Sequence, residues 1–185
     1  MITKVPNPVL FQKAKPVGQI DKKTKKIIQD LKTTLTATDK PKGVGLAAPQ
    51  IGVSLRIFAA RPKEKDPVKI FINPQILWKS DDLIEIEREE KSKKVKDDKK
   101  LEGCLSIDNV WGHLKRSSKV KIRYMDEKGE IKEETFSGFI ATIVQHETDH
   151  LDGILFTKRV LEQNEKIYSI EEDDKGKETL VEIKI

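Results

Sequence analysis

The chain has 185 residues, of which 36% are hydrophobic and 36% charged, and its 36 basic and 31 acidic residues give a formal net charge of +5. This length favours a single domain, at about 100–200 residues per domain. No apolar run approaches the roughly 18 residues of a membrane-spanning helix, and the first residues lack the apolar core of a secretory signal, so we expect a cytoplasmic protein and no membrane partner. Because charges of both signs are interspersed, the basic excess does not indicate direct nucleic-acid binding.

The first part of the chain predicts an arm followed by a helix. Prolines punctuate the first twenty residues and favour an extended arm. Apolar residues from Ile27 to Leu35 then recur at helical spacing. This pattern predicts an amphipathic helix that begins at Asp21 or Thr24 and stops before Pro41.

The middle of the chain predicts antiparallel sheet. Five segments have strand-like length and composition, several of them alternating: residues 55–60, 69–73, 83–87, 119–125 and 131–137. The last two flank Asp126-Glu127-Lys128-Gly129 and predict a hairpin. After Phe156 the composition is polar until residues 180–185, which predict an edge strand following a turn at 173–176.

A charged segment interrupts this pattern. Of the eighteen residues from Glu85 to Glu102, fourteen are charged, seven of each sign. Such a segment has almost nothing to bury, so we expect a surface excursion. The predicted organisation is one α+β domain over residues 1–185 with a charged insertion at about 85–101.

Residues 138–151 predict a second helix that carries a metal-binding pattern. In His146-Glu147-Thr148-Asp149-His150 two imidazoles lie four residues apart, so one helix face can offer both to a divalent metal ion. Glu147 then stands beside the metal and can accept a proton from water whose pKa the metal lowers. The alternative is a chance pattern on an ordinary amphipathic helix.

A catalytic metal site needs a third protein ligand. No further histidine follows at the spacings of the extended zincin motifs. Cys104 is the only cysteine, so it cannot form an internal disulfide, and Gly103 before it permits a tight backbone path. A small buried hydrophobe is the alternative role of this thiol, but the histidine motif favours a metal ligand.

The segment Gly43-Val44-Gly45-Leu46-Ala47-Ala48 satisfies the dinucleotide-binding pattern G-x-G-x-x-A. That pattern must follow a buried strand and open a helix. Here the preceding residues are polar, and Pro49 would interrupt the helix in its first turns. Nucleotide binding is therefore not favoured.

Three separated motifs together resemble the signatures of peptide deformylases, in the same order: GVGLAAPQ at 43–50, EGCLS at 102–106 and QHETDHLDG at 145–153. The resemblance implies an α+β fold with antiparallel or mixed sheets around a central metal-binding helix. It implies a hydrolase that removes the N-formyl group from the first methionine of nascent polypeptides and releases formate. It also implies one divalent metal ion, normally Fe²⁺ with Zn²⁺, Ni²⁺ or Co²⁺ as substitutes, bound by Cys104, His146 and His150.

The same resemblance implies roles for four further residues. Glu147 takes a proton from the attacking water and delivers it to the leaving amine. The Gln50 side-chain amide and the Leu105 backbone N–H donate hydrogen bonds to the carbonyl oxygen. Gly45 lets its backbone lie beside the formyl group, where a side chain would intrude.

Further residues are expected around the substrate. An apolar pocket should receive the methionine side chain, and Arg116 and Gln145 should support the site through hydrogen bonds, Arg116 by pairing with Glu102. The residues expected to line the pocket are Val44, Glu102, Phe139 and Ile143.

The chain departs from many bacterial members of this family. Asp108 stands where a proline is frequent, Trp111 where a basic residue is frequent, and the charged insertion precedes EGC. The tail lacks the long basic C-terminal helix that docks on the ribosome in many members, so we expect at most transient proximity to the ribosome.

Two other functions fit parts of the sequence. A zincin-type endopeptidase would share the HExxH chemistry but would cleave within a peptide. A non-catalytic binding protein would keep the fold and the metal, with the charged insertion as its contact surface.

Overall fold

The structure, a computed structural model, describes residues 1–39, 41–86, 101–172 and 178–184. Residues 87–100, most of the predicted insertion, and the predicted turn at 173–176 lie outside the described residues. No helix within the described ranges is long and apolar enough to cross a membrane.

The described strands pair antiparallel in three sheets. The main sheet has the order β1 (Gly45–Ala47), β2 (Ile57–Ala60), β3 (Lys69–Lys79), β8 (Lys119–Met125) and β9 (Ile131–Ser137). The second has the order β11 (Glu178–Glu182), β10 (Ile167–Glu172), β6 (Ile107–His113) and β5 (Leu101–Cys104). In the third, β4 (Leu83–Glu85) pairs with β7 (Lys115–Ser117).

The described helices are α1 (Lys22–Ala37), α2 (Phe139–Leu151) and α3 (Phe156–Glu162), with 3-10 helices η1 (Pro8–Phe11) and η2 (Ala48–Ile51). This mixture of helices and antiparallel sheets confirms the predicted α+β class.

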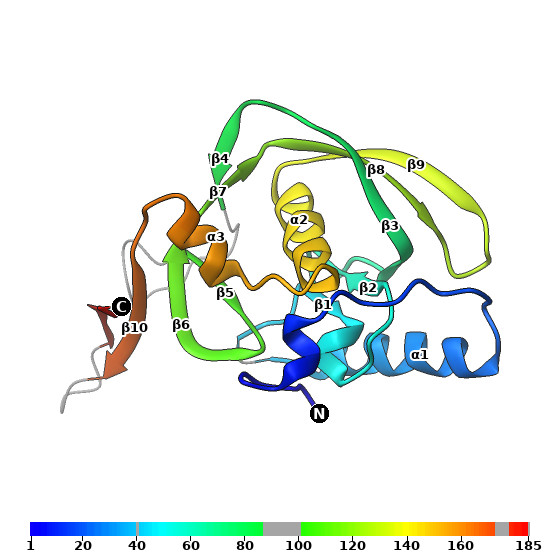
Figure 1. Cartoon of the computed structure of the whole chain (residues 1–185), viewed down its shortest axis with the longest axis horizontal. Helices are drawn as coiled ribbons and strands as arrows, with labels where there is room; N and C mark the ends of the chain where they lie inside the picture. Colours follow the sequence, from blue (N-terminus) through cyan, green and yellow to red (C-terminus); the bar gives the residue numbers. More distant parts are fainter. Residues whose placement is uncertain (40, 87–100, 173–177, 185) are drawn as a thin grey trace.

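The main sheet separates two apolar clusters. Along β2 the side chains alternate: Ile57 and Ala59 pack with α1, whereas Phe58 and Ala60 pack with the face toward α2. Alternation is the consequence of a strand's period of two. The sheet is therefore covered on both faces, and α2 lies in the middle of the molecule beneath the arch of β3, β8 and β9 (Figure 1).

The helix predictions are confirmed, with one correction in the arm. Asp21 is the N-cap of α1, since its carboxylate accepts a hydrogen bond of 2.8 Å from Thr24 N–H. The helix ends at Ala37, before the proline. The prediction of a wholly extended arm is wrong at η1, where Asn7 caps a short 3-10 turn through Val9 N–H.

The hairpin of β8 and β9 has the predicted bounds, but other strands differ. Strand β2 begins at Ile57 because Leu55 instead forms an isolated bridge with Lys15 of the arm. Strand β3 was predicted to end at Asn73 but continues to Lys79. Asn73 has a positive φ of 50°, and the strand pairs with β8 again from Gln75 onward.

The region after Phe156 contains elements that the sequence did not predict. Phe156 and Val160, four residues apart on α3, are buried against Leu114 and Ile167. Strand β10 follows, and β11 begins two residues before the predicted Leu180. The buried apolar residues of this polar region are too few to form a periodic pattern, so the sequence did not predict α3 or β10.

Candidate active site

Three side chains of the kind that bind metal ions meet between β5 and α2. Cys104 is the last residue of β5, and His146 and His150 lie one turn apart on α2. Their ligand atoms lie within 4.8 Å of one another, and Cys104 Sγ is 3.1 Å from His150 Nε2. All three residues are buried, and within the described ranges no other group of this kind is found.

The carboxylate of Glu102 orients His146. Its Oε1 lies 2.6 Å from His146 Nδ1, which leaves Nε2 of that ring for the cluster. Arg116 donates to the same carboxylate twice, from Nε at 2.9 Å and from Nη2 at 2.7 Å. Burial opposes ionisation, yet the charges and hydrogen bonds of Arg116 and His146 hold the pKa of Glu102 well below its usual range. Glu102 is therefore an anion at neutral pH.

Arg116 also ties this pair to the next turn of α2. Its Nη1 donates to Asp149 Oδ2 at 2.8 Å, and Arg159 of α3 donates to Asp149 Oδ1 at 2.9 Å. The expected pair of Arg116 and Glu102 is thus part of a network that joins β5, β7, α2 and α3.

Glu147 is buried at the wall of the site. The residue is 3% exposed, and its Oε2 has no hydrogen-bond partner in the described part of the protein. Burial raises the pKa of Glu147 to about 7; the charge on His146 lowers this pKa and the charge on Glu102 raises it, each by less than burial does. A carboxyl group with such a pKa can both accept and return a proton near neutral pH.

Gly45 allows β1 to approach α2 closely. A Cβ atom at this position would overlap the Glu147 carboxylate and lie 2.9 Å from Ile143 Cγ2. The sequence predicted space for a formyl group as the reason for this glycine. The structure adds a second reason, because any side chain here would displace Glu147.

Gln50 is held with its amide nitrogen toward Cys104. Its Oε1 accepts a hydrogen bond of 2.8 Å from Ala47 N–H, and its Nε2 lies 3.6 Å from Cys104 Sγ and 3.2 Å from Ser106 Oγ. Ser106 N–H also donates to Cys104 Sγ, at 3.4 Å. The Leu105 carbonyl accepts a hydrogen bond from Lys4 Nζ at 2.7 Å, so the arm fixes the loop that follows Cys104.

A cavity of about 1000 Å³ opens beside this cluster. Its lining includes every residue for which a catalytic or substrate-contacting role was expected: Val44, Gly45, Gln50, Glu102, Leu105, Phe139, Ile143 and Glu147. Cys104 and His146 also line it, whereas His150 lies behind them and is 1% exposed. Although Glu102 lines the cavity, both of its carboxylate oxygens are engaged by Arg116 and His146.

The hydrogen bonds of Gln145 tie α2 to β7, the strand that carries Arg116. Gln145 Nε2 donates to Ser117 O at 2.9 Å and to Ala141 O at 3.0 Å, so it anchors α2 to β7 rather than the candidate ligands. One residue along a helix is a rotation of about 100°, which turns Gln145 away from the face of His146. Sequence reasoning missed Arg61 and Thr142, which also line the cavity and belong to no motif.

The sequence model of the polypeptide deformylase family matches residues 1–166. The chain belongs to this family. A peptide deformylase from Pseudothermotoga lettingae is 45% identical over 150 residues, which cover 81% of this chain and 76% of the relative. The family assignment and the enzyme class that the three motifs implied are thus confirmed.

Solved structures of peptide deformylases share the fold. The enzyme from Thermotoga maritima matches with a TM-score of 0.73 and 34% identity over 86% of this chain and 96% of that chain. The enzyme from Synechococcus elongatus, in complex with actinonin, matches with a TM-score of 0.73 and 32% identity over 86% of this chain and 79% of that chain.

Two residues at which this chain differs from many deformylases, Trp111 and Asp108, lie at different distances from the cavity: Trp111 lines it and Asp108 does not. Trp111 of β6 lines the cavity and stacks over Gly103, where a Cβ atom would lie 2.6 Å from the indole ring. Asp108 accepts a hydrogen bond from Lys4 Nζ at 2.5 Å and does not line the main cavity. Trp111 therefore bears on substrate contacts, whereas Asp108 bears on the position of the arm.

The network behind His146 predicts an effect on metal affinity. Arg116→Lys keeps the charge but cannot make two parallel bonds to Glu102 and a third to Asp149. We expect the affinity for Zn²⁺ to fall about tenfold or more, measured by competition with a chromophoric chelator. Arg123→Lys is the control, because Arg123 pairs with Glu133 on the exposed side of β8. Equal affinities of the two variants would show that the network does not tune the ligands.

Proposed function

We propose that the chain hydrolyses the N-formyl group of formyl-methionyl nascent polypeptides and releases formate, using one divalent metal ion held by Cys104, His146 and His150. Fe²⁺ is the proposed physiological ion, with Zn²⁺, Ni²⁺ or Co²⁺ as substitutes. The observation that carries the proposal is the meeting of a thiol and two imidazoles beside the unpartnered carboxylate oxygen of Glu147, at the wall of one cavity.

The residues present fit a transition-metal ion. Sulfur and imidazole nitrogen are ligands that suit Fe²⁺ and Zn²⁺, and three protein ligands leave a position open, as catalytic sites require. The hydrogen bond that His146 Nδ1 donates to the Glu102 carboxylate is of the kind that metal-bound histidines make with an outer partner. A divalent ion held there is a Lewis acid that polarises a carbonyl oxygen and makes water more acidic at neutral pH.

The protein's own groups then perform the proton transfers. Glu147 Oε2, which has no hydrogen-bond partner among the described residues, is available to take a proton from the attacking water. The same carboxyl group can deliver that proton to the nitrogen of the leaving peptide. The products are formate and a free amino terminus.

Negative charge develops on the formyl oxygen during the attack, and two donors are proposed to stabilise it. The first is Gln50 Nε2, whose orientation is fixed because Gln50 Oε1 is bound to Ala47 N–H. The second is the backbone N–H of Leu105, directly after Cys104. A preorganised donor of this kind is worth about 2.7–4 kcal/mol in the transition state.

The cavity supports a peptide substrate. In the described part of the sheet β1 pairs only with β2, so it is an edge strand to which an extended peptide can add. Val44, Phe139 and Ile143 offer apolar surface for the methionine side chain. The space at Gly45, bounded by Glu147, suits the small formyl group.

Formate release tests the proposal directly. The protein, purified without oxygen and loaded with Fe²⁺, should release one formate per formyl-Met-Ala-Ala-amide molecule, with no internal cleavage. Formate is measured with a coupled dehydrogenase and the peptides by mass spectrometry. Chelation should abolish the release and added Fe²⁺ should restore it. Internal fragments without formate would instead support an endopeptidase, and release that is unaffected by chelation would contradict metal dependence.

The proton-transfer role of Glu147 predicts a selective loss of kcat. Glu147→Gln keeps the size of the side chain but removes its basicity, so kcat should fall by a factor on the order of 10²–10⁴. Metal content, measured by mass spectrometry, should stay the same because Glu147 is not a proposed ligand. Glu133→Gln, on the surface of β9, is the matched control. A Glu147→Gln variant with full kcat would refute this role.

A further inference from the structure

Arg61 is a buried cation without a hydrogen-bonded partner. The residue is 9% exposed, and its Nε atom has no hydrogen-bond partner. No ion pair of its guanidinium is found among the described residues, although the charge of Arg61 contributes, after that of Lys42, to lowering the pKa of Glu64. Arginine is rarely buried unless an anion or several acceptors satisfy its five N–H groups, since desolvating a charge is costly. The free protein therefore keeps a guanidinium ready for a ligand.

This guanidinium belongs to the wall of the active-site cavity. Arg61 lines the same cavity as Gln50, Cys104 and Glu147. Its position is fixed by the sheet, because Arg61 directly follows β2 and its backbone N–H donates to Val44 O at 2.7 Å. Gly45, next to Val44, is the residue that touches the Glu147 carboxylate.

Arg61 therefore lies outward from the reacting groups, along β1. A strand advances about 3.3 Å per residue, so Val44 and Gly43 lead from Gly45 toward the outer part of the cavity wall. A formyl-methionyl peptide that adds to the β1 edge places the residues after its methionine near this outer part. The added peptide would lie two strand spacings, about 9.6 Å, from the backbone of Arg61, so the arginine and an acidic side chain of the peptide would meet across β1.

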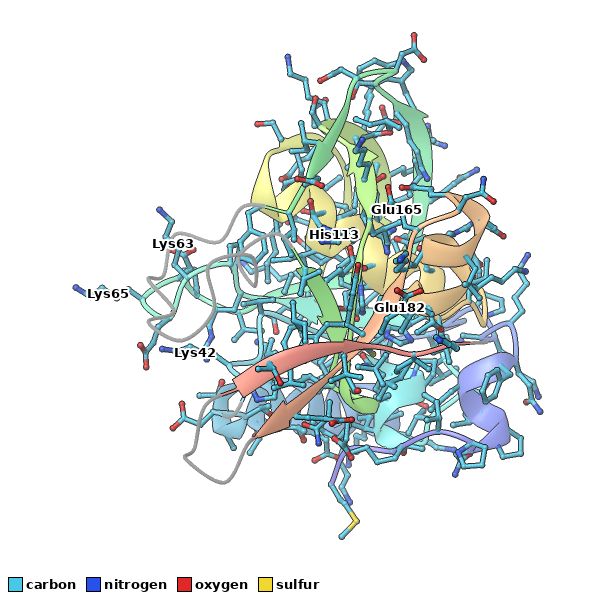
Figure 2. The ribbon with its side chains drawn as sticks, turned by 90° about the vertical axis from the view of Figure 1, so that its left-hand side faces the viewer. Lys42, Lys63, Lys65, His113, Glu165 and Glu182 are labelled. Carbon is cyan, nitrogen blue, oxygen red and sulfur yellow. The ribbon has the colours of Figure 1, made fainter. Side chains whose placement is uncertain are left out.

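The two acidic side chains of the loop after β2 each have one carboxylate oxygen bonded to a group other than Arg61. Glu64 Oε2 accepts a hydrogen bond from Lys42 Nζ at 2.5 Å, and Asp66 Oδ2 accepts one from Lys63 N–H at 3.1 Å. Lys42 and Lys63 line the cavity themselves, and Figure 2 shows them on the same side of the molecule as Lys65. Among the described residues, three basic side chains (Arg61, Lys42 and Lys63) and two acidic ones (Glu64 and Asp66) line this part of the cavity.

We propose that Arg61 binds the side-chain carboxylate of an Asp or Glu in one of the two positions after the formyl-methionine, and so makes acidic nascent chains the preferred substrates. This inference rests on the proposed deformylase function. A carboxylate matches the planar, forked guanidinium and would supply the hydrogen bonds that Arg61 lacks in the free protein.

The test compares kcat/KM for formyl-Met-Ala-Ala-amide with its analogues that carry Glu, Gln or Lys at the second or third position. We expect at least one Glu peptide to be hydrolysed about tenfold faster than its Gln counterpart, the ratio that one charge-assisted hydrogen bond supplies. The Lys peptides should be the slowest. Formyl-Met-Ala-Ala as a free acid is also tested, because it carries a terminal carboxylate and no acidic side chain. It shows whether Arg61 binds a terminal carboxylate rather than a side-chain carboxylate. A preference confined to that free acid overturns the side-chain assignment.

Two variants locate the preference. Arg61→Gln should abolish the Glu over Gln preference, measured as the ratio of the two kcat/KM values within the same variant. Lys65→Gln removes an equal charge from the same loop, outside the cavity lining, and should retain the preference. The unfolding temperature of Arg61→Gln should not be lower than that of the unmodified protein, because the substitution removes a charge that has no ion-pair partner among the described residues.

The outcomes separate the two hypotheses. Absence of formate from every peptide would contradict the proposed function itself. Formate from all peptides at equal kcat/KM, measured on the unmodified protein, would overturn the role of Arg61 even if the variant failed to fold. A preference that persists in Arg61→Gln, or disappears equally in Lys65→Gln, would also overturn it.

Discussion

An ionised carboxylate in the protein interior joins the two segments that carry the candidate metal ligands. Glu102 lies two residues before Cys104 in β5 and bonds to His146 of α2, 44 residues further along the chain. The charge is tolerated because Arg116 and His146 together satisfy both oxygens. Separating β5 from α2 would leave a buried charge unpaired, which costs about 3–5 kcal/mol in comparable pairs. The geometry of the cluster therefore depends on this carboxylate.

Some polar side chains of helix α2 make hydrogen bonds that hold the fold together, whereas Glu147 is available for chemistry. Every residue from Ala141 to Leu151 is buried, although several are polar. Gln145 and Thr148 bond to backbone carbonyls, and Asp149 bonds to two arginines. Three buried polar atoms of α2 have no partner among the described residues: Thr142 Oγ1, Glu147 Oε2 and His150 Nδ1. Since buried polar atoms are nearly always satisfied, the unpartnered carboxylate oxygen of Glu147 at the cavity wall indicates a group kept available for a substrate or a proton.

Sequence patterns predicted the parts of this protein that are locally encoded. The cap at Asp21 and the hairpin of β8 and β9 depend on neighbouring residues, and the HExxH spacing fixes two imidazoles on one helix face. Cys104 was predicted to approach that helix face because a catalytic metal site needs a third protein ligand. Arg61 could not be predicted, because its significance is the absence of a partner in three dimensions. The motif position of Gln145 did not reveal that its partners are the carbonyls of Ser117 and Ala141.

The central claim is that Cys104, His146 and His150 together hold one metal ion. X-ray absorption spectroscopy of the protein loaded with one equivalent of Zn²⁺ tests it most directly. We expect one sulfur at about 2.3 Å and two imidazole nitrogens at about 2.0–2.1 Å, with the sulfur lost in Cys104→Ser. A spectrum with no sulfur neighbour, or one that Cys104→Ser leaves unchanged, would contradict the account.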